Sequence, residues 1–348
     1  MVPRVSVVVP AYNSSRELRE CLPALVRSVP TPLEIIVVDD ASTDDTSRVA
    51  TEYGAIVLPL ARNCGPAAAR NAGGRAARGD IVLFVDADVV VAAEAMGRVV
   101  HAFENDPGLA AVFGSYDRHP RAPGLVSQYR NLLHHYTHQI GRPEASTFWS
   151  GCGAIRRSVF IGVGGFDADR FPRPSIEDIE LGYRLRVAGY RIRLDREIQG
   201  THLKRWGLLS VIRTDVASRA VPWARLMLTG RGAPDDLNVR WDQRVSVGLV
   251  GLAVLLGIAS PLRIELTGIA AGALAAVLII NRRWLGFLRR ECGVAFALMC
   301  VPLHLVYFLY SGLSFGYVWL ALHVGSAPSP RGTPIAADRE PRRAKDDP

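Results

Sequence analysis

The stretch Ile81-Val82-Leu83-Phe84-Val85-Asp86-Ala87-Asp88 is a short apolar run that ends in two carboxylates. A run of this length and composition predicts a strand that is buried on both faces, as in a parallel sheet. Ligands of such sheets bind beyond the carboxyl ends of the strands. The two aspartates alone would fit a solvated turn equally well, but their place after a strand favours a binding site.

The residues before this stretch repeat the pattern of a buried strand followed by a helix. Another β-branched strand ends at Asp39-Asp40, so a second pair of carboxylates falls at the same edge. Alternating elements predict an α/β fold with a doubly wound, mostly parallel sheet. The expected strands are 5–9, 34–38, 55–58 and 81–85, and the expected helices are 14–29, 44–53 and 65–78.

The signals weaken from Val112 to Phe171, where Gly, Pro and aromatic residues are interspersed. We expect short strands and a long loop there. Residues 162–167 then predict a turn, and 179–188 predict a helix that is closed by Gly189.

The apolar residues, 49% of the 348-residue chain, are concentrated after Val245. Residues 245–260 and 264–280 are nearly uncharged, and 294–324 form a longer apolar run. A spanning helix needs roughly 20 residues, so we expect three membrane spans, or four if the last run breaks at 311–316. The arginines between 281 and 290 place that segment in the cytosol by the positive-inside rule.

Residues 206–230 combine apolar side chains with Arg213, Arg219 and Arg225. This pattern predicts an amphipathic segment in the membrane interface, broken at Pro222; an ordinary surface helix is the alternative. The expected divisions are a catalytic domain (1–205), an interfacial segment (206–244), transmembrane helices (245–324) and a disordered tail (325–348).

The formal charge of +8 comes from scattered arginines and favours a membrane surface over nucleic acid. The 5 cysteines lack the spacing of a disulfide framework or a zinc site. The first residues predict a strand and leave no room for a signal peptide, so we expect a cytosolic catalytic domain on a multi-pass protein of the inner membrane.

Four ordered blocks of this sequence resemble glycosyltransferase family 2. They are VVPAYN at 8–13, VVDDASTD at 37–44, NCGPAAARN at 63–71 running on to Asp86-Ala87-Asp88, and GGFD at 164–167 followed by EDIELGYR at 177–184. The resemblance covers residues 5–206. It implies a GT-A fold, an inverting single-sugar transfer from a UDP- or GDP-linked sugar, and Mg²⁺ or Mn²⁺ as cofactor.

The resemblance also implies roles for the residues at the strand ends. Asp88 is the expected metal ligand, and Asp86 either contacts the ribose or shares the metal. Carboxylate oxygens suit a hard divalent ion, which offsets the charge of a departing diphosphate. The expected donor-binding residues are Pro10, Ala11, Tyr12, Asn13, Asp39, Asp40, Arg70, Asp86 and Ala87, where Asp39 either supports Asp40 or caps a helix.

Inversion requires a base on the acceptor side, and Glu177-Asp178 resembles the acidic pair of the family. We expect Asp178 to be the base, although acidic residues in a first helical turn also occur for structural reasons. His202-Leu-Lys-Arg205-Trp206 keeps the spacing of a Q-x-x-R-W motif with His in place of Gln. His202 is either a third metal ligand or a structural histidine, and Glu177, Gly151, Arg205 and Trp206 are grouped as acceptor or phosphate residues.

Other candidates receive weaker predictions. His134, His135 and His138 are expected to pack or to line the acceptor side, and Arg156-Arg157 either bind an anion or are solvated. A lipid or lipid-linked acceptor is expected because the apolar segments place the site beside a membrane. A processive polysaccharide synthase, a nucleotidyltransferase and a non-catalytic scaffold are the competing classes.

Overall fold

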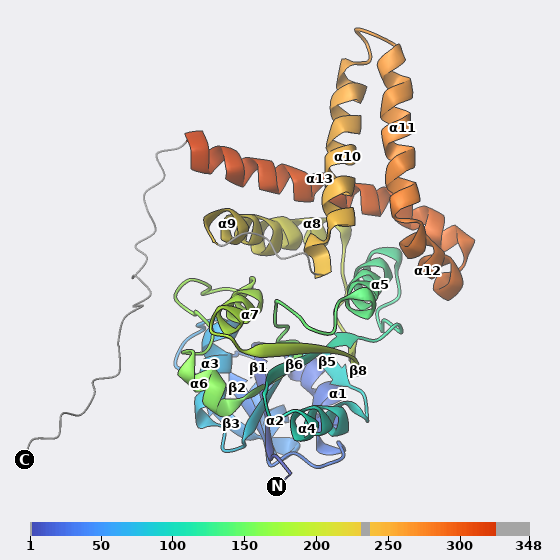
Figure 1. The fold of residues 1–348 in the computed structure, drawn as a ribbon. Helices are drawn as coiled ribbons and strands as arrows, with labels where there is room; N and C mark the ends of the chain where they lie inside the picture. Colours follow the sequence, from blue (N-terminus) through green and yellow to red (C-terminus); the bar gives the residue numbers. More distant parts are fainter. Residues whose placement is uncertain (1, 231–236, 325–348) are drawn as a thin grey trace, which may run out of the picture.

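The computed structural model describes residues 2–230 and 237–324, and the predicted disordered tail lies outside them. An α/β domain occupies the N-terminal part, a layer of helices lies above its sheet, and a helical hairpin projects beyond that layer (Figure 1).

One mixed sheet forms the centre of the α/β domain, with the strand order β3-β2-β1-β4-β7-β6-β8-β5. Strands β1 to β4 are parallel, as the sequence predicts, whereas β7 runs antiparallel to both β4 and β6. The strands are β1 (Val5–Ala11), β2 (Glu34–Asp39), β3 (Ile56–Pro59), β4 (Ile81–Val85), β5 (Val89–Val91), β6 (Leu109–Tyr116), β7 (Cys152–Arg156) and β8 (Arg191–His202).

Helices cover both faces of the sheet, because successive strand residues point to opposite sides. On β1, Val7 and Val9 join a core with α1 and α4, whereas Val8 joins a second core with α3, α6 and α7. The helices of this domain are α1 (Ser15–Val26), α2 (Thr46–Glu52), α3 (Pro66–Ala76), α4 (Ala95–Asn105), α5 (Leu125–Ile140), α6 (Arg157–Gly162) and α7 (Glu177–Val187).

The expectation of a long loop between residues 112 and 171 is wrong. Helix α5 occupies 16 residues of it, and β6, β7 and α6 take up much of the rest. Asn, His, Tyr and Thr are poor helix formers, which weakens the local signal. Residues from outside the α/β domain cover this helix. Its side chains Tyr129, Leu132 and Leu133 pack against Trp284 and Leu288.

The expected break at Pro222 is also absent. The chain is helical from α8 (Leu208–Thr214) through a π-helical turn, η1 (Asp215–Ala220), into α9 (Val221–Thr229). A π-turn shifts the backbone hydrogen bonds by one residue, which provides room for a proline without a break.

The C-terminal helices follow a short 3₁₀ turn, η2 (Leu237–Val239). They are α10 (Trp241–Ala259), α11 (Glu265–Ile280), α12 (Arg282–Cys292) and α13 (Val294–Val324). By length and composition α10 and α13 could cross a membrane, and the pair α11–α12, bent by 62°, would add a third span. Helix α13 has no break at 311–316, where the sequence left a fourth span open.

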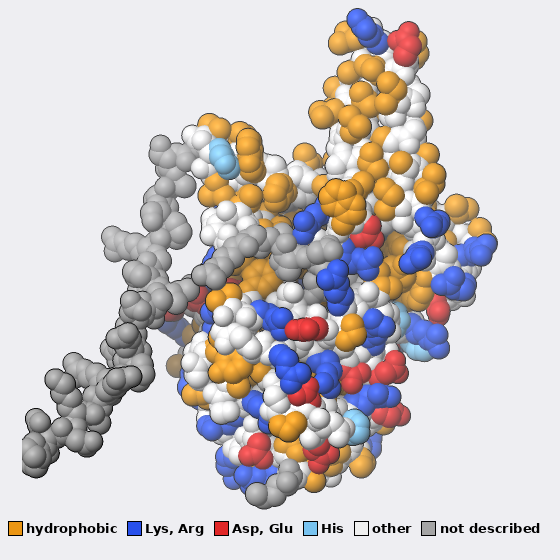
Figure 2. Space-filling view, in the orientation of Figure 1, with side chains coloured by type: hydrophobic (Ala, Val, Ile, Leu, Met, Phe, Trp, Pro, Cys, Tyr) orange, Lys and Arg blue, Asp and Glu red, His pale blue; other side chains and the backbone are white. Residues whose placement is uncertain are grey.

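The hairpin of α10 and α11 leaves the helical layer and returns to it, while α13 runs across its base (Figure 1). Hydrophobic side chains dominate the visible surface of the hairpin, and basic side chains gather where it meets the rest of the molecule (Figure 2). Helix α12 packs on α5 through Trp284 and Leu288, so its four arginines lie on the same side as the α/β domain.

Candidate active site

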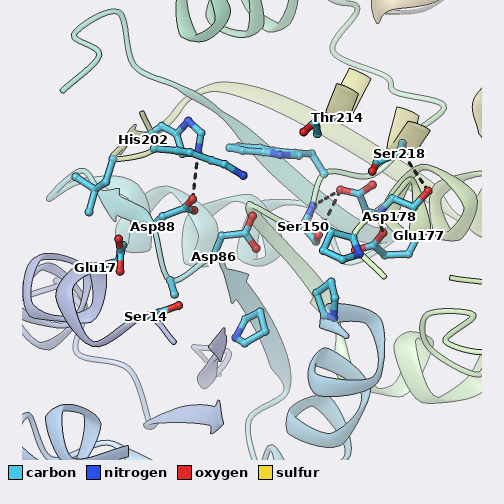
Figure 3. Close-up of a pocket in the computed structure, with 18 of the residues that line it drawn as sticks. Ser14, Glu17, Asp86, Asp88, Ser150, Glu177, Asp178, His202, Thr214 and Ser218 are labelled. Atoms are coloured by element: carbon cyan, nitrogen blue, oxygen red, sulfur yellow. Dashed lines mark hydrogen bonds and ion pairs between the residues drawn. The ribbon is translucent and has the colours of Figure 1, made fainter. Parts of the chain in front are cut away.

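A large cavity of about 1340 Å³ lies beyond the carboxyl ends of β1 and β4. Helix α7 and the loop before β7 form one wall, and residues of α5 and of the continuous helix 208–229 face it from above. Asp86 and Asp88 lie on one side of this space, and Asp178 lies on the other (Figure 3). The fold thus brings together the three carboxylates that the sequence singles out.

Asp88 and His202 form a close pair in the cavity. Asp88 directly precedes β5, and β5 pairs with β8 so that Val89 lies opposite His202, which places Asp88 next to the histidine ring. The distance from Asp88 Oδ2 to His202 Nε2 is 3.3 Å. Burial acts to raise the pKa of Asp88, but the contact with His202 and the nearby charge of Lys204 outweigh it and hold that pKa low.

The other ring nitrogen of His202 is also occupied. Its Nδ1 lies 2.8 Å from Oδ1 of Asn131, and an amide oxygen can only accept a hydrogen bond. This contact places a proton on Nδ1 and fixes the ring with Nε2 facing Asp88. Tyr116 stacks on the ring with centroids 4.3 Å apart. The arrangement suits a histidine that ligates a metal.

Asp86 is turned toward Arg70 rather than toward Asp88 and His202. Arg70 donates to Asp86 Oδ1 at 2.6 Å and to Glu177 Oε1 at 2.9 Å, and its side chain is buried. Within residues 2–230 and 237–324, no three His, Cys, Asp or Glu side chains converge as a ready metal site. The metal role of Asp86 therefore stays a prediction.

Asp178 lies in the first turn of α7, and the loop before β7 fixes its carboxylate. Oδ2 accepts hydrogen bonds from the backbone N–H and the hydroxyl of Ser150, at 3.1 and 3.3 Å. Burial, aided by the charge of Glu177, raises the pKa of Asp178 to about 6. A carboxylate of raised pKa that faces a cavity is suited to accept a proton.

The residues that leave β1 and β2 form the far end of the cavity. Pro10, Ala11, Tyr12 and Asn13 line it, as does Asp40. Both oxygens of Asp40 accept backbone N–H groups, from Cys64 at 2.7 Å and from Gly65 at 2.8 Å. Burial raises the pKa of this carboxyl.

Two of the expected site residues do not line the cavity. The carboxylate of Asp39 instead accepts hydrogen bonds from the backbone of Ser42 and the hydroxyl of Ser47, which supports the turn before α2. Gly151 lies behind the site, where its carbonyl accepts the N–H of Asp86 at 3.2 Å. Asp39 thus bonds to the segment that leads into α2, and Gly151 contacts Asp86 through the backbone.

Arg205 and Trp206 line the cavity where β8 leads into α8. Trp206 is buried, and its backbone N–H donates to Ser127 of α5 at 2.7 Å. Lys204 places its ammonium 4.3 Å from the centroid of the Trp206 ring. Arg205 is exposed, and it forms no ion pair with any residue that the structure describes.

The remaining candidates divide between packing and structure. His135 and His138 bond to carbonyls of β6, at Tyr116 and Gly114, while the ring of His134 packs at a tilt against Tyr116 and faces the cavity. Arg156 and Arg157 bond to backbone carbonyls away from the cavity. The arginine pair therefore has structural partners and is not part of this site.

Sequence reasoning missed several residues of the cavity wall, chiefly Tyr116, Arg130, Trp149 and Ser150, and it missed Asn131, which contacts His202 from behind. Asn131 and Arg130 stand on α5, which was not expected to be a helix. Ser150 precedes Gly151 by one residue, but only the approach of α7 brings it to Asp178. The apolar spacing of Leu125, Tyr129, Leu132 and Tyr136 was the available signal.

Residues 6–164 match the sequence model of the family described as Glycosyl transferase family 2. The chain is 31% identical over 208 residues to the probable glycosyltransferase YdaM of Bacillus subtilis (strain 168), which covers 55% of this chain and 49% of that protein. It is 30% identical over 233 residues to the validoxylamine A glucosyltransferase of Streptomyces hygroscopicus subsp. limoneus, covering 57% and 51%. The chain thus spans about half the length of these curated relatives.

Among solved structures, the mannosyltransferase PcManGT from Pyrobaculum calidifontis, in complex with GDP-Man and Mn²⁺, aligns with a TM-score of 0.58. The alignment covers 91% of this chain and 88% of that one at 22% identity, so it shows a shared fold. What the two proteins share is the parallel-rich sheet, which in this chain carries carboxylates at its strand ends. At the level of sequence, the match to the model of glycosyl transferase family 2 is confined to residues 6–164.

Proposed function

We propose that this protein is an inverting glycosyltransferase that moves a single sugar from a nucleotide-diphosphate sugar to a lipid or lipid-linked acceptor at the cytosolic face of a membrane. One observation carries the proposal. The Asp88–His202 pair and the half-buried base candidate Asp178 face a single cavity, and this cavity lies beneath the helices that are apolar enough for a membrane.

The residues present fit a divalent ion at Asp88 and His202. The pair combines a carboxylate with an imidazole nitrogen 3.3 Å away, and Asn131 holds the other ring nitrogen. Such an ion offsets the negative charge that develops on a diphosphate leaving group. The solved mannosyltransferase of similar fold contains Mn²⁺ and GDP-Man, which supports Mn²⁺ or Mg²⁺ and a UDP- or GDP-linked donor here.

Residues of the chain carry out the remaining steps. We assign the nucleobase of the donor to the end of the cavity formed by residues 10–13 and Asp40. The diphosphate is assigned to the end near Asp88. An acceptor hydroxyl that enters from the side of helix 208–229 meets Asp178. The carboxylate of Asp178 takes the hydroxyl proton while the oxygen attacks the anomeric carbon from the face opposite the leaving group, and this single displacement inverts the configuration.

Arg70 has a positioning role in this proposal. Its buried guanidinium bridges Asp86 on the donor side to Glu177 beside the base. The bridge fixes the distance between the two halves of the site, and such positioning lowers the entropic cost of reaction. Two charge-assisted hydrogen bonds make Arg70 hard to replace by lysine, which lacks the planar fork.

The test uses the purified full-length chain in detergent, with UDP- and GDP-sugars, Mn²⁺ and a membrane lipid extract. Asp178→Asn and Asp88→Ala are expected to abolish sugar transfer, whereas Asp169→Asn, an exposed residue outside the cavity, should act like the wild type. Wild-type turnover and donor hydrolysis in both active-site variants would refute the residue assignments. A ladder of products, rather than a single-sugar adduct, would show a processive synthase instead.

A further inference from the structure

Two arginines on the membrane side of the cavity share one buried carboxylate. Arg130 of α5 donates through Nη2 to Oδ1 of Asp215 at 2.9 Å, and Arg219 of η1 donates through Nη1 to the same oxygen, also at 2.9 Å. The hydroxyl of Tyr310 on α13 donates to the other oxygen, Oδ2, at 2.6 Å. The cluster therefore joins the α/β domain, the continuous helix 208–229 and the apolar helix α13.

The charges in this cluster do not balance. Asp215 contributes one negative charge against two guanidiniums, and the ion pairs with both arginines hold the pKa of Asp215 below its usual range although burial opposes them. Only 6% of the Asp215 side chain is exposed, compared with 18% for Arg130 and 41% for Arg219. Both arginines line the cavity, and Asp215 does not. The excess positive charge is thus presented to the cavity.

The cluster has the position expected of an acceptor site. The carbonyl of Ser218 accepts a hydrogen bond from Ser175, which stands just before α7, so η1 lies directly over the start of that helix. Thr214 and Ser218 lie above Asp178 in Figure 3. A molecule that approached Asp178 from the side of the apolar helices would pass between these elements.

The donor end of the cavity is built from different elements. Residues 10–13 and Asp40 belong to the β1 and β2 ends, whereas Arg130 and Arg219 stand on helices that contact α13. Guanidiniums bind phosphate groups through two parallel N–H bonds, and neither arginine uses all of its donors on Asp215. The free donors suit an oxyanion that belongs to the acceptor.

We propose that Arg130 and Arg219 bind a phosphate or diphosphate group of the lipid-linked acceptor, while an acceptor hydroxyl reaches Asp178. The inference rests on the proposed glycosyl transfer and specifies its acceptor as an anionic lipid. Tyr310 acts as a positioning residue, because it holds Asp215 and through it the orientation of both arginines.

The experiment measures ligand binding separately from transfer. Full-length protein in an uncharged maltoside detergent is titrated calorimetrically with decyl phosphate, decan-1-ol and inorganic phosphate. The variants are Arg130→Gln and Arg219→Gln, with Arg213→Gln as the matched control. Arg213 is exposed on the same continuous helix and lies outside the cavity. Binding of UDP- and GDP-sugars is measured in parallel on every sample.

Wild type and Arg213→Gln are expected to bind decyl phosphate with equal affinity. The affinity of Arg130→Gln and of Arg219→Gln should be lower by about tenfold or more. Decan-1-ol should not compete with decyl phosphate, and donor affinity should be unchanged. Misfolding is a poor explanation for a loss of binding in Arg219→Gln, because that side chain is the more exposed of the two. Unchanged decyl phosphate binding in Arg219→Gln would overturn the proposal.

Two further outcomes would also overturn it. If the donor sugar binds more weakly in both arginine variants, the pair serves the donor diphosphate. If inorganic phosphate binds as tightly as decyl phosphate, the site takes a free anion and not a lipid. Failure of the proposed function itself would look different, because donor binding and transfer would then be absent in wild type whatever decyl phosphate does.

Discussion

The side-chain oxygen of Asn131 lies 2.8 Å from Nδ1 of His202, and the opposite ring nitrogen lies 3.3 Å from Asp88. Helix α5, which was not expected from the sequence, thus orients His202, which was a candidate from the sequence. The same helix carries Arg130, which holds Asp215, and Tyr129, whose hydroxyl lies 2.9 Å from His304 of α13. Helix α5 therefore links the candidate metal pair to the apolar helices.

Removing the amide of Asn131 should weaken metal binding. Without its partner the His202 ring can rotate or change tautomer, and loss of such a contact typically costs roughly 10- to 100-fold in metal affinity. Mn²⁺ affinity of Asn131→Ala, measured by titration calorimetry without donor, should fall by that amount. Asn105→Ala is the control, because Asn105 contacts the exposed His101 on α4. Equal affinities in both variants would contradict the orienting role.

The rate of transfer should depend on the protonation of Asp178. Burial and the charge of Glu177 raise the pKa of Asp178 to about 6, and only the deprotonated form accepts a proton. The rate should therefore fall tenfold per pH unit below about 6 and level off above it. Single-turnover transfer measured from pH 4.5 to 8 checks this.

Glu177→Gln tests the cause of that pH dependence. The substitution removes a negative charge next to Asp178, which lowers the pKa of Asp178, so the acid limb of the profile should move to lower pH. The same pH series on the variant measures the shift. A limb that stays in place or moves upward would show that another group controls the rate.

Loss of the Arg70 bridge should destabilise the fold. Arg70→Met leaves Glu177 buried without its cation and Asp86 without a partner, and breaking a buried pair of this kind costs about 3–5 kcal/mol. Thermal melting in detergent should show a marked decrease. Arg75→Met, on the exposed end of the same helix, should change stability by less than about 0.5 kcal/mol. Equal melting temperatures would mean that the bridge is not structural.

A methyl group at Gly182 should impair the base without touching it. An added Cβ would lie 2.4 Å from the backbone nitrogen of Phe148, so Gly182→Ala must push α7 away from the loop that holds Ser150. We expect loss of the Ser150–Asp178 hydrogen bonds and a decrease in transfer of about 100-fold, since small misplacements cost that much. Gly162→Ala, with open space around its Cβ, is the control. Wild-type turnover of Gly182→Ala would contradict this account.

Much of the α/β domain could be predicted because its signals are local. The run from Ile81 to Val85 is a strand with those same bounds, and Asp86 and Asp88 follow it into the cavity. The helix expected at 179–188 is present and begins two residues earlier, at Glu177. Strands buried on both faces must be continuously apolar, so the chain itself marks where each strand ends and where a ligand can approach.

The parts that could not be predicted depend on partners far away in the sequence. Helix α5 mixes strong helix formers with Asn, His, Tyr and Thr, and residues of α12 and α13 stabilise it by covering its apolar side. The partners of Asp39 are Ser42, in the turn before α2, and Ser47, in the first turn of that helix. The continuity of helix 208–229 through Pro222 required a π-turn that the residue pattern does not indicate.

The sequence by itself determined the class of the domain and the carboxylates Asp86, Asp88 and Asp178, because neighbouring residues indicate where a strand ends and where a helix starts. Only the tertiary structure decided what each carboxylate contacts. His202 comes to Asp88 through strand pairing, Arg70 comes to Asp86 and Glu177 through the packing of α3, and Asp215 gathers Arg130, Arg219 and Tyr310 from three separate elements. The partners of these charged groups are distant in the sequence, and a local residue pattern does not indicate which groups will form an ion pair.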